Sequence, residues 1–461
     1  MIHKQPIPTL LVLVALSLLI IIAGSNALAH PHGAHGHSHA PTDYTTHDHG
    51  PEYIAPIPDE AGFYWWKGNL HTHTLWSDGD QYPEVVVDWY KQHGYHFLSL
   101  SDHNILSQGQ KWINPETSRF AQSSGGLKGF EYYREQFGDE WVETRTNGDD
   151  ELEVRLKPLN EFRTLFEEPG RFLMIQGEEI TDHLAVHVNA TNLIHYIPPQ
   201  GGDTVQETIE RNFEAVLEQQ EETGQAMLPH LNHPNFQWAV AAEDMIPVEN
   251  LQFFEVYNGH RSVFNFGNDV HIDLDRMWDI VLSMRLGELN LETVYALAVD
   301  DSHNYDDSLT ETALPGRGWV MVRTRFLTPE HLIAAMEAGD FYASTGVTLS
   351  SITTSDDGLS ITIEPEEGIT YTTKFIGTRK GFDPSSEPVL DNEGNPVKIT
   401  KRYSDEIGVV LKEVEGTSAS YTLEGDELYV RALVVSSKPK ENYFAHGELE
   451  MAWVQPIVPQ N

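Results

Sequence analysis

The chain has 461 residues, 40% of them hydrophobic and 21% charged, which is enough for two or three domains with a sizeable core. Its 70 acidic residues against 29 basic ones give a net charge of −41, which repels phosphate backbones and argues against binding to duplex nucleic acid. The absence of cysteine excludes disulfides and thiolate ligands, so stability must come from a packed core and from metal binding.

Residues 1–29 are typical of a signal peptide. Lys4 precedes an apolar run over about residues 9–23, and Ala27 and Ala29 are the small residues that signal peptidase prefers. The pattern predicts an exported protein, periplasmic or secreted, with no membrane span after cleavage. The alternative is an uncleaved anchor, because the run approaches the length of a membrane-spanning helix.

Residues 30–60 form a low-complexity segment. Seven histidines are scattered among Gly, Pro, Ser and Asp without apolar periodicity, so the segment is predicted to be disordered. It either loads or buffers a divalent metal ion or serves as a soluble spacer, and the sequence leaves both interpretations open.

From residue 61 to 345, strands and helices alternate. This alternation of helices with short apolar strands predicts an α/β domain with a parallel sheet buried on both faces, and a barrel is its natural closure. A polar insertion at about residues 107–170 contains an expected β-hairpin that turns at Asn147-Gly148, near the mouth of the site. The predicted helices cover 82–94, 204–224 and 274–287, and the predicted strands cover 96–104, 171–180, 185–194, 226–234, 251–259 and 293–304.

From residue 346 to 461, the hydrophobic pattern changes to a period of two residues. Turns rich in Gly, Asp and Asn separate the alternating stretches, which predicts a small all-β, sandwich-like domain.

His71 and His73 follow a predicted strand. Residues at positions i and i+2 of a strand point to the same face, so both imidazoles can hold one metal ion. Such a pair alone is weak evidence, because it is often only the polar face of a strand. Further groups of His and carboxylate residues are each expected at the C-terminal end of another predicted strand, where barrel enzymes gather their catalytic groups. These residues are Asp78, Asp102, His103, Glu179, His187, His233, Asp301 and His303.

Six motifs in this order resemble the polymerase and histidinol phosphatase (PHP) family of metallohydrolases: HTHTLWSDG, LSDHN, QGEEI, HLNHPN, EVYNG and VDDSHN. The resemblance extends over about residues 64–345 and implies a distorted seven-stranded β/α barrel with a centre of two or three metal ions. LNHPN, GDFYASTG and the final AWVQPI resemble an exported branch that includes carbamate-hydrolysing enzymes of the carbaryl hydrolase kind.

The resemblance also implies three groups of ligands. Glu179 would bridge the first two metal ions, and its place after Gly177 selects it over Glu178. Asp102 is expected to orient a ligand imidazole without binding metal itself. Asp78 stands where other members have histidine. The ligands would be His71, His73, Glu179 and Asp301 for the first metal, Glu179, His187 and His233 for the second, and Asp78, His103 and His303 for the third.

These ligand types determine the expected chemistry. Imidazole and carboxylate ligands suit zinc, manganese or iron. Two neighbouring ions acidify a bridging water and stabilise developing negative charge, so no serine or cysteine nucleophile is needed. The sequence therefore predicts a hydrolase that uses metal-bridging hydroxide on a small-molecule ester, first of all a phosphate monoester or diester. The alternatives are a hydrolase of carbamates or carboxylic esters and a non-catalytic metal-binding protein.

Other polar residues near the motifs have weaker assignments. Arg261 and Arg317 are candidates for binding an anionic substrate, although a structural ion pair is the commoner role of such arginines. His230 is either a general acid or a buried structural histidine. Aromatic residues near 62–66 and 235–238 would line an apolar pocket if the substrate were a carbamate. The sequence does not indicate an oligomeric state, and it predicts structural roles for His183, His195, His260 and His271.

Overall fold

The computed structural model describes residues 56–123, 125–305, 313–391, 393–443 and 445–459. The predicted signal peptide and most of the histidine-rich segment lie outside these residues. Within the described part of the chain, no helix is long and apolar enough to cross a membrane.

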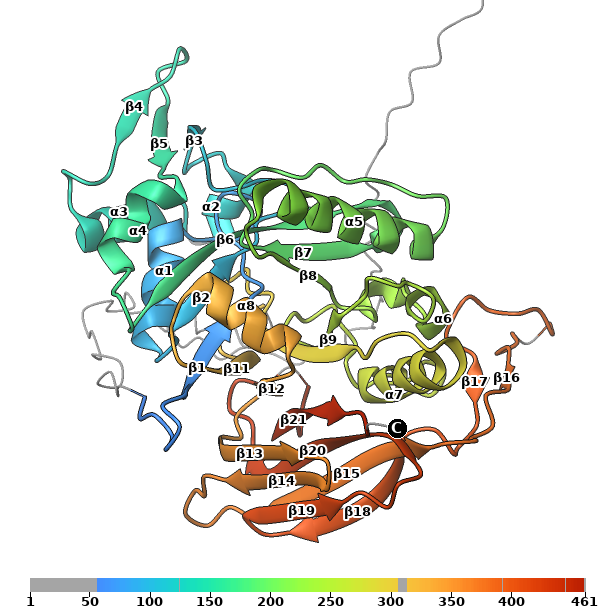
Figure 1. Cartoon of the computed structure of the whole chain (residues 1–461). Helices are drawn as coiled ribbons and strands as arrows, with labels where there is room; N and C mark the ends of the chain where they lie inside the picture. Colours follow the sequence, from blue (N-terminus) through green and yellow to red (C-terminus); the bar gives the residue numbers. More distant parts are fainter. Residues whose placement is uncertain (1–55, 124, 306–312, 392, 444, 460–461) are drawn as a thin grey trace, which may run out of the picture. The chain divides into compact units, whose positions relative to one another are not determined.

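A large mixed sheet carries the predicted ligands (Figure 1). Its strand order is β10-β9-β8-β7-β6-β2-β1-β11-β12-β21-β20-β15-β18. The predicted strands up to residue 304 all occur, and most of their apolar residues are buried. They are β1 (Tyr64–Asn69), β2 (Phe97–Leu100), β6 (Leu173–Thr181), β7 (His187–Thr191), β8 (Leu228–Leu231), β9 (Phe253–Asn258) and β10 (Tyr295–Val299).

The prediction of a parallel sheet is wrong for three strands. β7 pairs antiparallel with both β6 and β8. For β6 the reason is the connection at residues 182–186, which is far too short for the crossover that parallel strands need. β11 (Trp319–Thr324) is antiparallel to β1, and β12 (Phe341–Ser344) is antiparallel to β11.

The two ends of the ligand-bearing strand series meet at one rim. An isolated parallel bridge joins Thr72, beyond β1, to Ser302, beyond β10. The N–H of Asp301 donates to the carbonyl of His71, and the N–H of His73 donates to that of Ser302, both at 3.0 Å. Among the described residues, β1 and β10 themselves form no ladder, so the closed barrel stays a prediction.

Helices cover the sheet. α5 (Val205–Thr223) packs against β7 and β8 through Ile209, Phe213 and Val216. The helix begins at the Thr204 cap, whose side chain accepts the N–H of Glu207, and it ends at a left-handed Gly224. The other helices of this part are α1 (Pro83–Gln92), α6 (Ala242–Met245), α7 (Leu274–Met284) with a π-helical end at Arg285–Leu289, and α8 (Pro329–Glu337).

The insertion contains the expected hairpin, a third strand and three helices. β4 (Thr144–Thr146) and β5 (Leu152–Leu156) pair antiparallel around the turn at Asn147, and β3 (Lys111–Ile113) adds a third strand. Buried apolar residues of this segment pack with Leu75 and Trp76 of the loop that follows His73. The helices of the insertion are α2 (Arg119–Ser123), α3 (Leu127–Phe137) and α4 (Leu159–Phe166).

The C-terminal strands form two layers with a shared core. Leu359 and Ile361 of β14 pack with Phe375 of β15 and Val454 of β21. One layer continues the large sheet, because β21 pairs antiparallel with β12. The strands are β13 (Leu349–Ser355), β14 (Gly358–Ile363) and β19 (Ser418–Thr422) in one layer, β15 (Tyr371–Arg379), β18 (Val409–Glu415), β20 (Glu427–Pro439) and β21 (Leu449–Ile457) in the other, and the small pair β16 (Ser386–Glu387) and β17 (Arg402–Tyr403).

These layers are also fixed to the α/β part by a buried ion pair. Arg431 of β20 is 1% exposed and contacts Asp279 of α7 through two hydrogen bonds of 2.7 and 2.8 Å. The proposed domain boundary at residue 345/346 therefore lies within a continuous sheet, and it stays a prediction.

Candidate metal centre

The structure brings the nine predicted ligands together. His71, His73, His103, His233, Asp301 and His303 lie just beyond the C-terminal ends of their strands, and Glu179 lies near the end of β6. His187 is instead the first residue of β7, which corrects the expectation that every ligand follows a strand. Because β7 is antiparallel to its neighbours, its first residue lies at the same rim as their ends.

The first group has the geometry of a closed metal site. Oε2 of Glu179 lies 3.3 Å from Nε2 of both His71 and His73, and Oδ1 of Asp301 lies 3.3 and 3.1 Å from the same two nitrogen atoms. Ligands of a tetrahedral ion with bonds of 2.0–2.1 Å stand about 3.3 Å apart, so these separations suit one ion.

Unsatisfied polar atoms support this fit. Nε2 of His71, Nε2 of His73 and Oε2 of Glu179 are buried and make no hydrogen bond within the described part of the chain. Buried polar atoms almost always have a partner, so the convergence of these three on one point fits a bound cation.

The second group shares Glu179. Its other oxygen, Oε1, lies 2.8 Å from Nδ1 of His187 and 3.4 Å from Nε2 of His233. The side chain of Asn232 donates to the same Oε1 at 2.9 Å, which fixes the carboxylate. The two oxygens of Glu179 therefore face two groups of imidazoles, as a bridging ligand requires.

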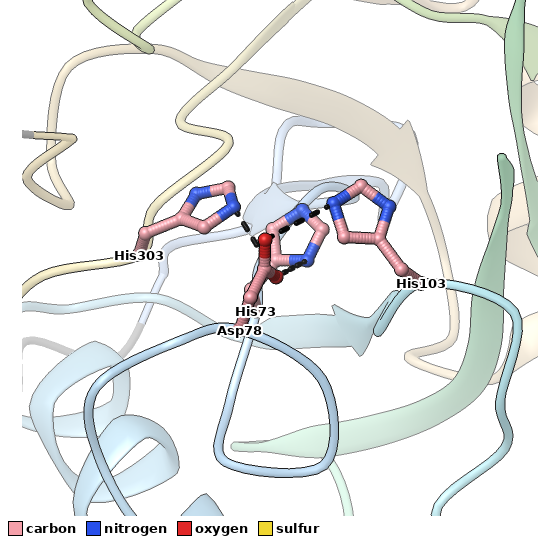
Figure 2. A group of neighbouring side chains, drawn as sticks. All are labelled: His73, Asp78, His103 and His303. Carbon is pink, nitrogen blue, oxygen red and sulfur yellow. Dashed lines mark ion pairs between the residues drawn. The ribbon is translucent and has the colours of Figure 1, made fainter. Parts of the chain in front are cut away.

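The third group surrounds Asp78 (Figure 2). Its carboxylate lies 3.4 Å from Nδ1 of His73, 3.5 Å from Nε2 of His103 and 3.4 Å from Nε2 of His303. His73 presents Nε2 to the first group and Nδ1 to this one. The side chain of Asp78 is 30% exposed, so this group is the most open of the three.

The electrostatics of the centre favour bound cations. Burial by itself lowers the pKa of His71, but Asp301, Glu255 and Glu179 outweigh it and raise that pKa well above its usual range. Glu179 likewise outweighs the burial of His103 and raises its pKa to about 11. Protons and a divalent ion therefore compete for the same nitrogen atoms, and metal binding displaces the protons.

Glu255 contacts the candidate centre and was not singled out from the sequence. It lies in β9, is fully buried, and places Oε1 2.6 Å from Nδ1 of His71. Its Oε2 accepts the N–H of His233 at 2.7 Å and the side chain of Asn258 at 2.8 Å. A carboxylate behind a ligand imidazole fixes its orientation and raises its basicity. The available signal was a single glutamate inside the apolar strand predicted at 251–259.

His230 also contacts this carboxylate, with Nε2 3.2 Å from Oε1 of Glu255. It is fully buried, as the structural interpretation expects.

Asp102 has a different role from the expected one. Its carboxylate accepts the N–H and the hydroxyl of Thr74, both at 2.9 Å, and the hydroxyl of Ser77 at 2.7 Å. Oγ of Ser77 also lies 3.1 Å from Oδ1 of Asp78. Asp102 thus fixes the loop that carries Asp78 and does not orient an imidazole directly, because the loop following His73 folds back over it.

Glu178 faces away from the centre, in agreement with the choice of Glu179. Oε1 of Glu178 accepts the N–H of Ile197 at 2.7 Å, and burial raises the pKa of this carboxyl to about 8.

The two arginines considered for substrate binding, Arg261 and Arg317, differ in exposure. Arg317 is 2% exposed, and its guanidinium donates to the carbonyl of Gly259 at 2.7 Å and to the side chain of Asn442 at 3.1 Å. These contacts agree with the structural role and leave the guanidinium inaccessible to a substrate. Arg261 is exposed on the loop after β9, where a contact with substrate stays a prediction.

Of the four histidines expected to be structural, one lies beside the centre. The ring of His260 is 5.1 Å from that of His303. His183 pairs with Asp182 at 2.7 Å, His271 stacks on Trp238 at 3.9 Å, and His195 is exposed.

No protein-family model matches the sequence, and no curated protein matches it. Among solved structures, a two-domain protein from Bacteroides vulgatus containing a predicted PHP-like metal-dependent phosphoesterase aligns with 88% of this chain and 99% of its own. The two share 15% sequence identity, with a TM-score of 0.37. This likeness is too low to transfer a fold or a function, so the case for the centre depends on the residues of this chain.

Proposed function

We propose that this protein is a metal-dependent hydrolase of phosphate monoesters or diesters, with two or three divalent ions of zinc, manganese or iron. The observation that carries the proposal is the convergence of His71, His73, Glu179 and Asp301, whose four donor atoms include pairs only 3.1–3.3 Å apart. Two further groups share Glu179 and His73 with this one, so neighbouring ions would share ligands.

Such ions, when bound, supply a hydroxide nucleophile near neutral pH and stabilise negative charge on the reacting group. The protein holds the ligands rigid for this purpose. The side chain of Asn258 donates to both Glu255 and Asp301, at 2.8 and 3.1 Å, and Asn232 fixes Glu179. Closely spaced cations in a strongly acidic protein form a local positive site, which favours an anionic ester over a neutral one.

The test combines metal content with a substrate panel. The purified chain is stripped with a chelator, reloaded with zinc, manganese or iron, and assayed with 4-nitrophenyl phosphate, bis(4-nitrophenyl) phosphate, 4-nitrophenyl acetate and an aryl carbamate. We expect at least two ions per chain and turnover of a phosphate ester that requires metal.

Two matched variants locate the activity. Glu179→Gln removes the bridging carboxylate and should abolish turnover. Glu178→Gln alters the adjacent buried acid, which faces Ile197, and should leave turnover intact. A chain that binds no metal, or that turns over no ester when loaded, contradicts the proposal.

Hydrolysis of a carbamate or carboxylic ester is the second candidate, because Phe236 borders the second ligand group. Its ring lies 5.0 Å from that of His233 and 5.8 Å from that of His187, where it can contact an apolar part of a substrate. Of the aromatic residues near 62–66, Trp66 does not contribute in this way, since it packs in the core with Phe97. Turnover of the carbamate or acetate without phosphate release would select this candidate.

Deleting residues 30–50 distinguishes an enzyme from a non-catalytic metal-binding protein. Turnover should survive the deletion if the barrel-like part is an enzyme, whereas metal capacity should collapse if the histidine-rich segment is the functional part. Export is a proposal from residues 1–29 alone, and the N-terminal sequence of the protein recovered from its native source tests it.

A further inference from the structure

We infer that Lys440 and Asn442, in the connection between β20 and β21, are positioning residues for the metal centre. They brace the backbone that carries Asp301 and His303. This inference rests on the proposed function and gives the C-terminal strands a part in metal binding.

The contacts begin at Lys440, which is 5% exposed. Its ammonium group donates to the carbonyl of Arg317 and, at 3.2 Å, to the hydroxyl of Tyr257 in β9. The carboxylate of Glu448 lies 3.6 Å from the same nitrogen. Lys440 therefore links the β20–β21 connection both to a core strand and to the segment around Arg317.

Asn442 adds two bonds to the same segment. Its side-chain oxygen accepts Nε of Arg317 at 3.1 Å, and its amide group donates to the carbonyl of Pro315 at 2.7 Å. Both partners of the side-chain amide thus lie within residues 315–317. The connection between β20 and β21 therefore supports this segment through Asn442.

Asp300 connects that backbone to the metal ligands. Its fully buried carboxylate accepts the N–H groups of Gly316, Arg317 and Gly318 at 2.9, 2.6 and 2.8 Å. Asp300 directly precedes Asp301 in the chain, so residues 316–318 fold around the residue next to a predicted ligand.

His303 depends on the same region. Its N–H donates to the carbonyl of Ala313 at 2.9 Å, and its own carbonyl accepts the N–H of Asp80 at 2.8 Å. Two predicted ligands therefore lie on a segment that is held between the loop after β1 and residues 313–318. Ligand positions must be kept to within about 0.5 Å, so loss of the outer brace should weaken metal binding.

The variants Lys440→Met and Asn442→Ala test this in the full-length chain. Lys440→Met removes the donor to Arg317 and Tyr257 and leaves Glu448 without that cation. Asn442→Ala is the milder change, because Asn442 is only half-buried, and it keeps the test valid if the lysine variant does not fold.

Arg431→Met is the matched control. It breaks a buried ion pair between β20 and α7, which joins the same two parts of the chain. Within the described part of the chain, Arg431 makes no hydrogen bond to residues 313–318. A general loosening of the C-terminal strands would affect all three variants alike, whereas a specific brace affects only the first two.

The dissociation constant of Mn²⁺ or Zn²⁺ is measured by competition with a chromophoric chelator, together with thermal unfolding. We expect Lys440→Met and Asn442→Ala to weaken at least one bound ion by about tenfold, as for other residues that support metal ligands. We expect Arg431→Met to lower the unfolding temperature without weakening the metal.

The inference is overturned if folded Lys440→Met and Asn442→Ala bind metal like the wild type, or if Arg431→Met weakens metal binding as much as they do. Failure of the wild-type chain to bind metal would instead overturn the proposed function, and this inference with it.

Discussion

Replacing Glu255 by glutamine tests whether the buried carboxylate behind His71 supports metal binding. Burial by itself raises the pKa of Glu255, but His71 and His230 outweigh it and lower this pKa to about 2, so the group is ionised at neutral pH. The substitution keeps the shape of the side chain and removes its charge. A hydrogen bond to a charged group is worth about 1.5–3 kcal/mol and one to a neutral group about 0.5–1.5 kcal/mol.

That difference of about 1–2 kcal/mol corresponds to a loss of roughly tenfold in metal affinity, since 1.4 kcal/mol is a factor of ten. The structure argues for a larger effect, because the 2.6 Å contact with His71 is one of four polar contacts of this carboxylate. We therefore expect metal affinity to fall by about 10- to 100-fold, the range found for other residues that orient a metal-binding histidine.

The assay is a competition titration of Mn²⁺ or Zn²⁺ into the stripped protein, with the metal content of the purified chain as a second measurement. Glu178→Gln is the matched control, because it replaces a buried glutamate that faces Ile197 and whose pKa burial raises to about 8. The side chain of Glu178 is therefore largely neutral at pH 7, so the Glu178→Gln variant should bind metal like the wild type. Wild-type affinity and turnover in Glu255→Gln would refute the assigned role.

Three further predictions concern stability. Arg431→Met should lower the free energy of unfolding by about 3–5 kcal/mol, as expected when Asp279 loses its buried partner, and urea unfolding measures this loss. Burial and nearby Lys67 lower the pKa of His96 from 6.5 to about 4, so the unfolded chain takes up that proton first as the pH falls. The stability that a neutral His96 contributes is therefore present above pH 6.5 and lost as the pH falls towards 4. Between these two pH values, the free energy of unfolding of the metal-free His96→Gln variant should fall by about 3 kcal/mol less than that of the wild type. Equal losses in the two proteins would contradict the assignment. Adding metal at a thousandfold excess over its dissociation constant should stabilise the stripped chain by about 4 kcal/mol, and an unchanged unfolding temperature would argue against a native metal site.

Several features of the candidate site could be predicted from the sequence because they depend on short-range patterns. The pair His71 and His73 owes its shared direction to the two-residue period of an extended chain. Alternation along β6 turns Glu179 and Glu178 to opposite faces, and the resemblance to the PHP family selected Glu179 as the one at the centre. The C-terminal strands could be predicted from their period-two pattern in the same way.

Other features depended on how distant segments pair. The direction of β7 decides that His187, at its start, reaches the rim. The short connection at residues 182–186 makes β7 antiparallel to β6, but only the tertiary structure shows that β7 also pairs antiparallel with β8. The burial of Arg317 follows from contacts with Gly259 and Asn442, which lie 58 and 125 positions away in the chain.

The sequence by itself thus indicated which short segments form strands, because periodicity is a property of a few consecutive residues, and its motifs named the candidate ligands through their resemblance to the PHP family. Only the tertiary structure decided that Glu255 supports His71, and that the sheet continues from β12 into β21. Both depend on contacts between residues more than a hundred positions apart, and a one-residue change of strand register would turn these side chains to the opposite face.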